Sequence, residues 1–216
     1  MKVLTKAILA MLLAFMPITT AQANATPSEK IAKLFTPAML RADIAFIDRN
    51  FGPPVSIFGD ERQYDVDGCD VVISAEKSVI SMELAVSPTC TFDLAPFVLA
   101  ERPLPVHELT FGGFEAEAGD SGEYKADCLL SCGNAYDPSV YLDYEGPRAT
   151  DFIKVRLGVK LVDDPAIQAA QAWSDIMVKE QGEAWVMDLK FNDDSRYDEI
   201  ARKLFRNVKI STVRLQ

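Results

Sequence analysis

Residues 61–94 read ERQYDVDGCDVVISAEKSVISMELAVSPTCTFDL, and this stretch predicts the centre of the fold. Its segments ERQYDV, DVVISA, SVISMELAV and CTFDL are rich in β-branched and aromatic residues, which favour strands. Turn residues separate the segments at positions 67–68, 76–77 and 87–88. Connections this short join neighbouring antiparallel strands, so the stretch predicts an antiparallel meander.

The positions of the cysteines predict which disulfides cross-link this meander. The chain has four, Cys69, Cys90, Cys128 and Cys132, and an even number favours two disulfides in an oxidising compartment, to which the pattern of residues 1–25 described below points. Three connectivities are possible, but in a hairpin the start of one strand lies beside the end of the next. This geometry favours Cys69–Cys90, which leaves Cys128–Cys132. The spacing fits neither a zinc site nor a C-x-x-C redox motif.

Two helices are predicted before the meander. TPSEKIAKLF has Thr26 as its expected N-cap, with Pro27 at the first helical position. TPAMLRADIAFIDRNFG, residues 36–52, repeats this start signal and carries one apolar stripe at helical spacing. Gly52 is expected to end this second helix, because two prolines follow it.

The rest of the chain is expected to add a second β-rich half. Residues 95–106 are a proline-broken connector between a first unit at 26–94 and a second at 107–216. In the second unit the pattern predicts strands at 107–118, 138–146, 152–162, 183–191 and 209–216, and helices at 164–182 and 195–208. The predicted fold class is therefore α+β: an antiparallel sheet with helices packed on one side, stapled by disulfides, in one or two subdomains.

Residues 1–25 have the three-part pattern of a secretory signal peptide. Lys2 and Lys6 precede an apolar run, and small residues at positions 21–25 offer a cleavage site. Removal would leave 20 basic and 32 acidic residues, a net charge of 20 − 32 = −12. No cysteine near the cleavage site could carry a lipid, and no later apolar run could span a bilayer. The expected location is the periplasm or the cell exterior.

The strong negative charge limits the classes of partner. It repels the phosphates of nucleic acids and anionic lipid headgroups, so neither nucleic-acid binding nor membrane insertion is expected. It favours a basic protein partner, although solubility alone also explains it. The sequence leaves the oligomeric state open.

Catalytic candidates are few. His107 is the single histidine, and no G-x-S-x-G motif accompanies it, which favours a structural role. Asp143 and Glu145 share one strand face, a weak candidate carboxylate pair for sugar hydrolysis that a solvated strand face also explains. Residues 188–198 are rich in Asp and Asn but lack EF-hand spacing, so helix capping is the preferred explanation. No cofactor or metal is expected.

The chain also contains an internal echo. FGPPVSIFGDERQYDVD, residues 51–67, and FGGFEAEAGDSGEYKAD, residues 111–127, agree at six of 17 positions, and a cysteine follows each. Gly and Asp recur in turns in any case, and the flanking segments differ. Duplication and reuse of the same turn residues both remain open.

Residues 27–94 are expected to form two short helices, followed by FGPP and by a meander that begins at ERQYDV. This order of parts gives the segment a family resemblance. The segment resembles the unit of β-lactamase-inhibitor-like proteins and of related small outer-membrane assembly lipoproteins, and Gly52-Pro53 is its shared motif. The resemblance implies a helix pair packed on an antiparallel sheet, and the inhibitors have two such units in tandem with disulfides. The second half here lacks the helix pair, no cysteine is placed for a lipid, and no inhibitory residue can be transferred.

These observations favour an exported binding protein whose partner is a protein, in an inhibitor-like or immunity-like role. One alternative is an envelope hydrolase that acts on glycan or peptide through carboxylates. A second alternative is a structural envelope protein.

Overall fold

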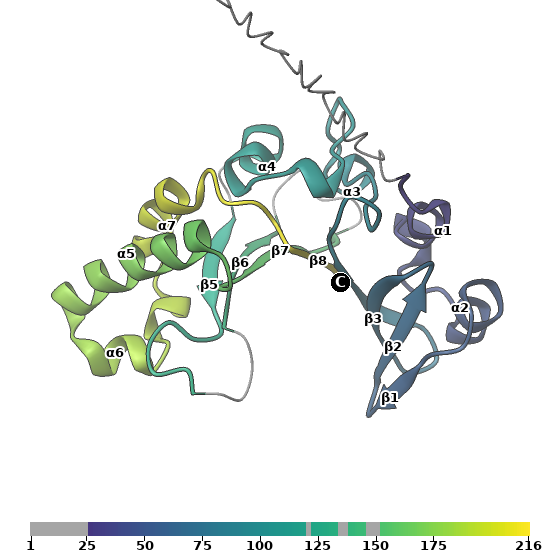
Figure 1. Cartoon of the computed structure of the whole chain (residues 1–216), viewed down its shortest axis with the longest axis horizontal. Helices are drawn as coiled ribbons and strands as arrows, with labels where there is room; N and C mark the ends of the chain where they lie inside the picture. Colours follow the sequence, from purple (N-terminus) through teal and green to yellow (C-terminus); the bar gives the residue numbers. More distant parts are fainter. Residues whose placement is uncertain (1–25, 120–121, 134–137, 146–151) are drawn as a thin grey trace, which may run out of the picture.

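The protein folds around one eight-stranded antiparallel sheet (Figure 1). The computed structural model describes residues 26–119, 122–133, 138–145 and 152–216, so the predicted signal peptide lies outside the described residues. The strand order is β1-β2-β3-β4-β8-β7-β6-β5, with every neighbouring pair antiparallel. The last strand, β8 (Thr212–Leu215), lies between β4 and β7 and joins both halves of the chain in one sheet.

Helices and strands follow one another along the chain in blocks of several elements each. The first half has α1 (Glu29–Leu34), η1 (Pro37–Met39), α2 (Ile44–Phe51), β1 (Ser56–Phe58), β2 (Glu61–Val66), β3 (Cys69–Ala75), β4 (Val79–Ala85) and α3 (Ala95–Val98). The second half has η2 (Val106–Glu108), α4 (Phe111–Ala118), β5 (Glu123–Ala126), β6 (Ser139–Tyr144), β7 (Val155–Lys160), α5 (Asp164–Gln181), α6 (Glu183–Met187), η4 (Lys190–Asp193), η5 (Ser195–Tyr197), α7 (Asp198–Phe205) and β8. This arrangement confirms the predicted α+β class.

The helices cover one face of the sheet, as predicted. In Figure 1, α1 and α2 lie beside β2 and β3, α3 and α4 lie above the middle, and α5, α6 and α7 lie at the β5 end. Alternate strand residues point into this core and are at most 3 % exposed. They are Tyr64, Val66, Cys69, Val71, Ile73, Met82, Leu84, Tyr124, Ala126, Val140, Leu142, Tyr144, Val155, Leu157, Val159, Val213 and Leu215. This period of two is that of an antiparallel sheet with one covered face.

Two segments predicted as strands are helical. Residues 107–118 form η2 and α4, because Thr110 accepts a hydrogen bond from the Gly113 amide and caps the helix. A Cβ on Gly112 would lie 2.8 Å from the Arg206 backbone oxygen, so this glycine allows α4 to pack against the end of α7. Residues 183–191 form α6 and the start of η4.

The first half also departs locally from the prediction. The second predicted helix is split into η1 and α2, since Asp43 accepts from the Ala45 amide and restarts the helix. Ser28, not Thr26, caps α1. CTFDL forms only an isolated bridge, from Asp93 to Pro105, and the sheet instead gains β1 at its edge.

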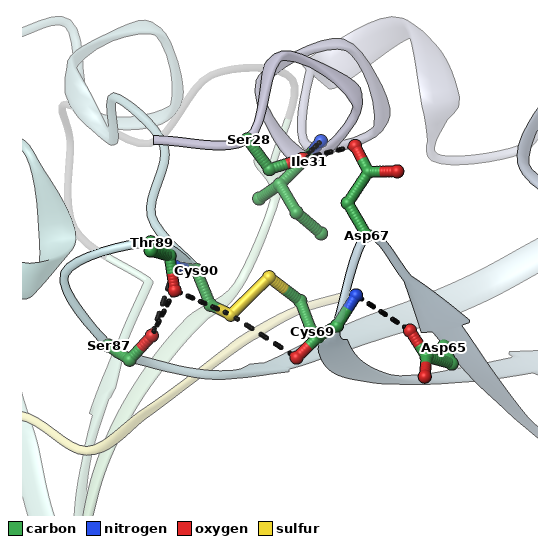
Figure 2. Close-up of a disulfide and its surroundings, with 9 residues drawn as sticks. Ser28, Ile31, Asp65, Asp67, Cys69, Ser87, Thr89 and Cys90 are labelled. Atoms are coloured by element: carbon green, nitrogen blue, oxygen red, sulfur yellow. Dashed lines mark hydrogen bonds between the residues drawn. A yellow bond between two sulfur atoms is a disulfide. The ribbon is translucent and has the colours of Figure 1, made fainter. Parts of the chain in front are cut away.

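Both predicted disulfides are present. Cys69–Cys90 joins the start of β3 to the segment after β4, with 5.5 Å between the Cα atoms, and Cys128–Cys132 closes a five-residue ring. Figure 2 shows the first bridge beneath α1, where the Asp67 carboxylate accepts a hydrogen bond from the Ser28 hydroxyl. The bridge therefore lies where the helix pair meets the meander.

The two ends of the sheet differ. At β5, side chains take the place of a further strand: Asn192 exchanges two hydrogen bonds with the Ala126 backbone, and Asp198 accepts from the Tyr124 amide. At the other end, β1 is three residues long, with Ile57 and Phe58 exposed. The β5 edge is thus closed to pairing with another chain.

Asp198→Asn is expected to stabilise the protein in mildly alkaline buffer. Burial raises the pKa of Asp198 to about 6, above its unfolded value, so its contribution to stability is present at low pH and lost as the pH rises through about 6. Asparagine keeps the acceptor for the Tyr124 amide without this loss. Urea unfolding should therefore show a gain of about 1–2 kcal/mol at about pH 8 that vanishes below about pH 4. A gain that persists at low pH would contradict this explanation.

Candidate functional site

The candidate site is the face of the sheet that no described helix covers, called here the open face. Its side chains alternate with those of the core and come from β3, β4, β5, β6, β7, β8 and the residue before β7. Its central members are Val72, Ser81, Glu83, Lys125, Ser139, Tyr141, Asp143, Lys154, Arg156, Thr212 and Arg214. Each is buried or half-buried although no described element lies over it, because the long polar side chains pack on one another.

A row of four charges crosses the centre of the open face. The strand registers place Glu83 opposite Arg214, Arg214 opposite Arg156, and Arg156 opposite Asp143. The order of charges is negative, positive, positive, negative. Two like charges directly opposite each other destabilise a sheet, so each arginine depends on the carboxylate on its outer side.

Asp143 is the most strongly held carboxylate of the row. Arg156 donates from Nε and Nη2 to its two oxygens at 2.6 and 2.9 Å, and the Lys154 Nζ lies 3.1 Å from Oδ2. Burial alone would raise the pKa of Asp143, but the hydrogen bonds and charges of Arg156 and Lys154 outweigh it and lower the pKa. The carboxylate is therefore held ionised, which suits an anchor for cations and not a general acid.

The other end of the row is looser. The closest distance between the Arg214 guanidinium and the Glu83 carboxylate is 3.9 Å, and Arg214 Nη2 donates to the Ser81 hydroxyl at 3.1 Å. Burial raises the pKa of Glu83, despite the nearby positive charges of Arg214 and Arg156. Glu83 is thus less firmly ionised than Asp143.

A hollow of about 240 Å³ lies beside this row. It is lined by Glu83, Asp127, Ser139, Tyr141, Arg156, Gly158, Thr212 and Arg214. A Cβ on Gly158 would lie 2.2 Å from the Thr212 Oγ1, so glycine at this position lets the Thr212 side chain pack directly on β7. The Arg156 guanidinium lies 3.9 Å from the centre of the Tyr141 ring, a cation–π contact that helps to hold Arg156 in place.

The predicted catalytic candidates are not brought together as a triad. Glu145 is exposed and shares Lys154 with Asp143. His107 lies on η2, where its Nδ1 contacts the Thr91 hydroxyl at 2.8 Å and its Nε2 lies 3.6 Å from Glu108. The contacts of His107 involve no residue of the open face, whereas Glu145 reaches its rim through Lys154. In the described ranges, no group of three or more His, Cys, Asp or Glu residues could hold a metal ion.

A larger hollow of about 500 Å³ lies between α4 and α7. Four of its charged side chains pair within the protein, since Arg202 donates to Glu115 and Lys203 to Glu199. The acidic segment 188–198 is likewise occupied by structural contacts, because Asn192 and Asp198 bind β5 and Asp194 caps η5. The open face is therefore the stronger candidate site.

No protein-family model, curated protein or solved structure matches this chain. Within the part of the chain that the structure describes, no helix is both long and apolar enough to cross a bilayer. The function is therefore inferred from the geometry of the open face.

Sequence reasoning found only part of this face. The alternation in residues 152–162 places Lys154, Arg156 and Lys160 on one side of a strand, and Asp143 is a candidate from its own segment. Sequence reasoning missed Glu83, Tyr141, Gly158 and Arg214. Nothing local in the sequence shows that β8 lies between β4 and β7. The polar alternation of VRL in the last strand was the only available signal.

Asp143→Asn is expected to lower the free energy of unfolding by about 1–3 kcal/mol, because it removes charged hydrogen bonds from a buried group. Glu145→Gln is the matched control, and an exposed ion pair is worth at most about 1 kcal/mol. Urea unfolding of the two variants measures both effects. Equal and negligible losses would show that Asp143 does not anchor the face.

Proposed function

We propose that this chain is an exported protein-binding protein that contacts its partner through the open face. The observation that carries the proposal is a wide sheet face, free of any described covering element, whose charged side chains are held by neighbours. Ordered side chains lose little conformational entropy on binding, so such a surface suits protein recognition. Tyr141 and arginine side chains supply the residue types enriched in protein interfaces.

The shape of the face favours a protein over a small substrate. Small-molecule sites are usually clefts of about 300–1,000 Å³ with predominantly apolar walls. The hollow on the open face is about 240 Å³ and is lined mainly by polar side chains. In addition, ion pairs hold Asp143 ionised, which argues against hydrolysis with this residue as the acid.

Export is supported by two independent features. Two disulfides are typical of proteins in oxidising compartments, and residues 1–25 have the pattern of a signal peptide. The resemblance of residues 27–94 to the β-lactamase-inhibitor-like unit adds an inhibitor-like role to the proposal. No inhibited enzyme is assigned.

The test compares two matched variants of exposed alanines. Ala85→Arg places a long side chain on the open face beside Thr212, and Ala116→Arg places the same side chain on α4. Each disulfide-intact protein is used to capture partners from a native cell-envelope extract, and the affinity of any captured protein is then measured.

The wild type and Ala116→Arg are expected to bind the same protein, and Ala85→Arg should bind it at least about tenfold more weakly. A partner that is lost with Ala116→Arg and kept with Ala85→Arg would place the interface on the helical side. Turnover of a glycan or peptide library by the wild type would favour the hydrolase alternative.

A further inference from the structure

Two arginine side chains lie next to each other at the centre of the open face. The pairing of β7 with β8 places Arg156 directly opposite Arg214. Neighbouring strands lie about 4.8 Å apart, so the two side chains leave the sheet from adjacent positions, and Glu83 feels the positive charge of both. An anion at this place would offset their repulsion.

Arg214 has hydrogen-bonding capacity that its neighbours leave unused. Its Nη2 donates to Ser81, but the nearest oxygen of Glu83 is 3.9 Å away, beyond hydrogen-bond distance. Its Nε has no hydrogen-bond partner in the described part of the chain. Arg156, by contrast, uses two of its nitrogens on Asp143. Arg214 is therefore the group that would gain most from an added acceptor.

The hollow beside the two arginines has the size and chemistry for one carboxylate. Gly158 and the hydroxyl-bearing side chains of Ser139, Tyr141 and Thr212 line this hollow, and the Thr212 hydroxyl occupies the place that a Cβ on Gly158 would need. A guanidinium presents a planar fork of donors that matches the two oxygens of a carboxylate.

The acidic members of the hollow select against more highly charged anions. Glu83 and Asp127 both line it, so a doubly charged phosphate would meet two carboxylates as well as two arginines. Asp127 is already bound by the Ser139 hydroxyl. Burial raises the pKa of Glu83. A monoanion fits this balance best.

We propose that the hollow receives one Asp or Glu side chain of the partner protein, held between Arg156 and Arg214 above Gly158. The inference rests on the proposed function for the source of the carboxylate, while the site itself is defined by this chain alone. It also reverses the expectation from net charge, since the contact at the centre of the face is to an acidic group of the partner.

The test uses a small probe that needs no knowledge of the partner. N-acetyl-glutamate N-methylamide is titrated into the full protein while the NMR signals of the Gly158, Tyr141 and Thr212 amides are followed. N-acetyl-glutamine N-methylamide is the uncharged control of the same shape. The proteins compared are the wild type, Arg214→Gln, Arg214→Lys and Arg206→Gln, the last being an exposed arginine at the end of α7.

The glutamate probe is expected to give saturable shifts with the wild type and with Arg206→Gln. Arg214→Gln should weaken it by about tenfold or more, and Arg214→Lys should restore part of the affinity. Equal binding of the glutamine probe, or unchanged binding by a folded Arg214→Gln protein, would overturn the inference. If Arg214→Gln fails to fold, the comparison of Arg214→Lys with the wild type still tests the site, because lysine keeps the positive charge but lacks the planar fork of donors.

Failure of the site and failure of the proposed function give different results. A partner lost with Ala85→Arg but bound equally by wild type and Arg214→Gln leaves the open face as the interface and removes the carboxylate site. Probe binding that depends on Arg214, without any partner that depends on Ala85, leaves the carboxylate site and removes the protein-binding function.

Discussion

Replacing both Cys69 and Cys90 by alanine is expected to lower the free energy of unfolding by about 3–5 kcal/mol. The bridge spans 21 residues, and the loop-closure relation assigns about 3 kcal/mol to a loop of this length. Both sulfurs also belong to the core, where Cys69 is fully buried and Cys90 is 6 % exposed. Their loss leaves space between α1, β3 and the segment after β4 (Figure 2).

The matched control is the alanine pair at Cys128 and Cys132. Their separation is four residues, for which the same relation gives about 2 kcal/mol, and neither residue belongs to the buried core. Urea unfolding of the two double variants, without reductant, should show the larger loss for the Cys69–Cys90 pair. Equal losses would contradict this prediction, because both the longer loop and the buried position favour a larger loss for the Cys69–Cys90 pair.

Arg202→Met is expected to cost about 3–5 kcal/mol, because it removes the cation that faces a buried carboxylate. Arg202 Nε donates to Glu115 at 2.8 Å, and the Tyr124 hydroxyl donates to the other oxygen of the same carboxylate at 3.3 Å. Glu115 is 4 % exposed, so water does not replace the lost charge. These contacts join α4, α7 and β5, and their loss should loosen that end of the sheet.

Lys203→Met supplies the control for this prediction. Lys203 is the next residue on α7, and its ion pair with Glu199 is exposed, so its loss should cost less than about 1 kcal/mol. A double variant, Glu115→Leu with Arg202→Met, should recover part of the stability, since a buried ion pair is often replaceable by apolar side chains. A single Arg202→Met variant as stable as the wild type would show that Glu115 tolerates burial without this partner.

Much of the first half of the fold could be predicted from the sequence. β2, β3 and β4 follow from β-rich segments separated by short turns, and the pairing of Cys69 with Cys90 follows from hairpin geometry. These features depend on residues close together in the chain. The same holds for α5, whose Asp-Pro start and Gly182 end are local signals.

The two segments that were wrongly predicted as strands depend on contacts with distant parts of the chain. Residues 107–118 contain two adjacent glycines, which lower helix propensity, yet they form α4 because Thr110 caps it and Gly112 allows contact with Arg206. Residues 183–191 are apolar enough for a strand, but Trp185 and Phe191 pack together in the helical C-terminal region. In both segments tertiary packing outweighs local propensity.

The internal echo takes a clearer form in the folded chain. Tyr64 lies in β2 and Tyr124 in β5, and these strands occupy matching positions, three strands from β8 on either side. Phe51, however, ends α2, whereas Phe111 begins α4. The echo therefore corresponds in its strand part and differs in its helical part.

The α+β class, the meander, the bounds of α5 and both disulfides follow from the amino-acid sequence, because periodicity, turns and caps act over short stretches of chain. The place of β8 between the two halves is visible only in the folded protein, as is the row formed by Glu83, Arg214, Arg156 and Asp143. Cross-strand neighbours are set by strand order and register, which depend on how the whole core packs. The candidate site consists of such neighbours, so it exists only once the sheet has formed.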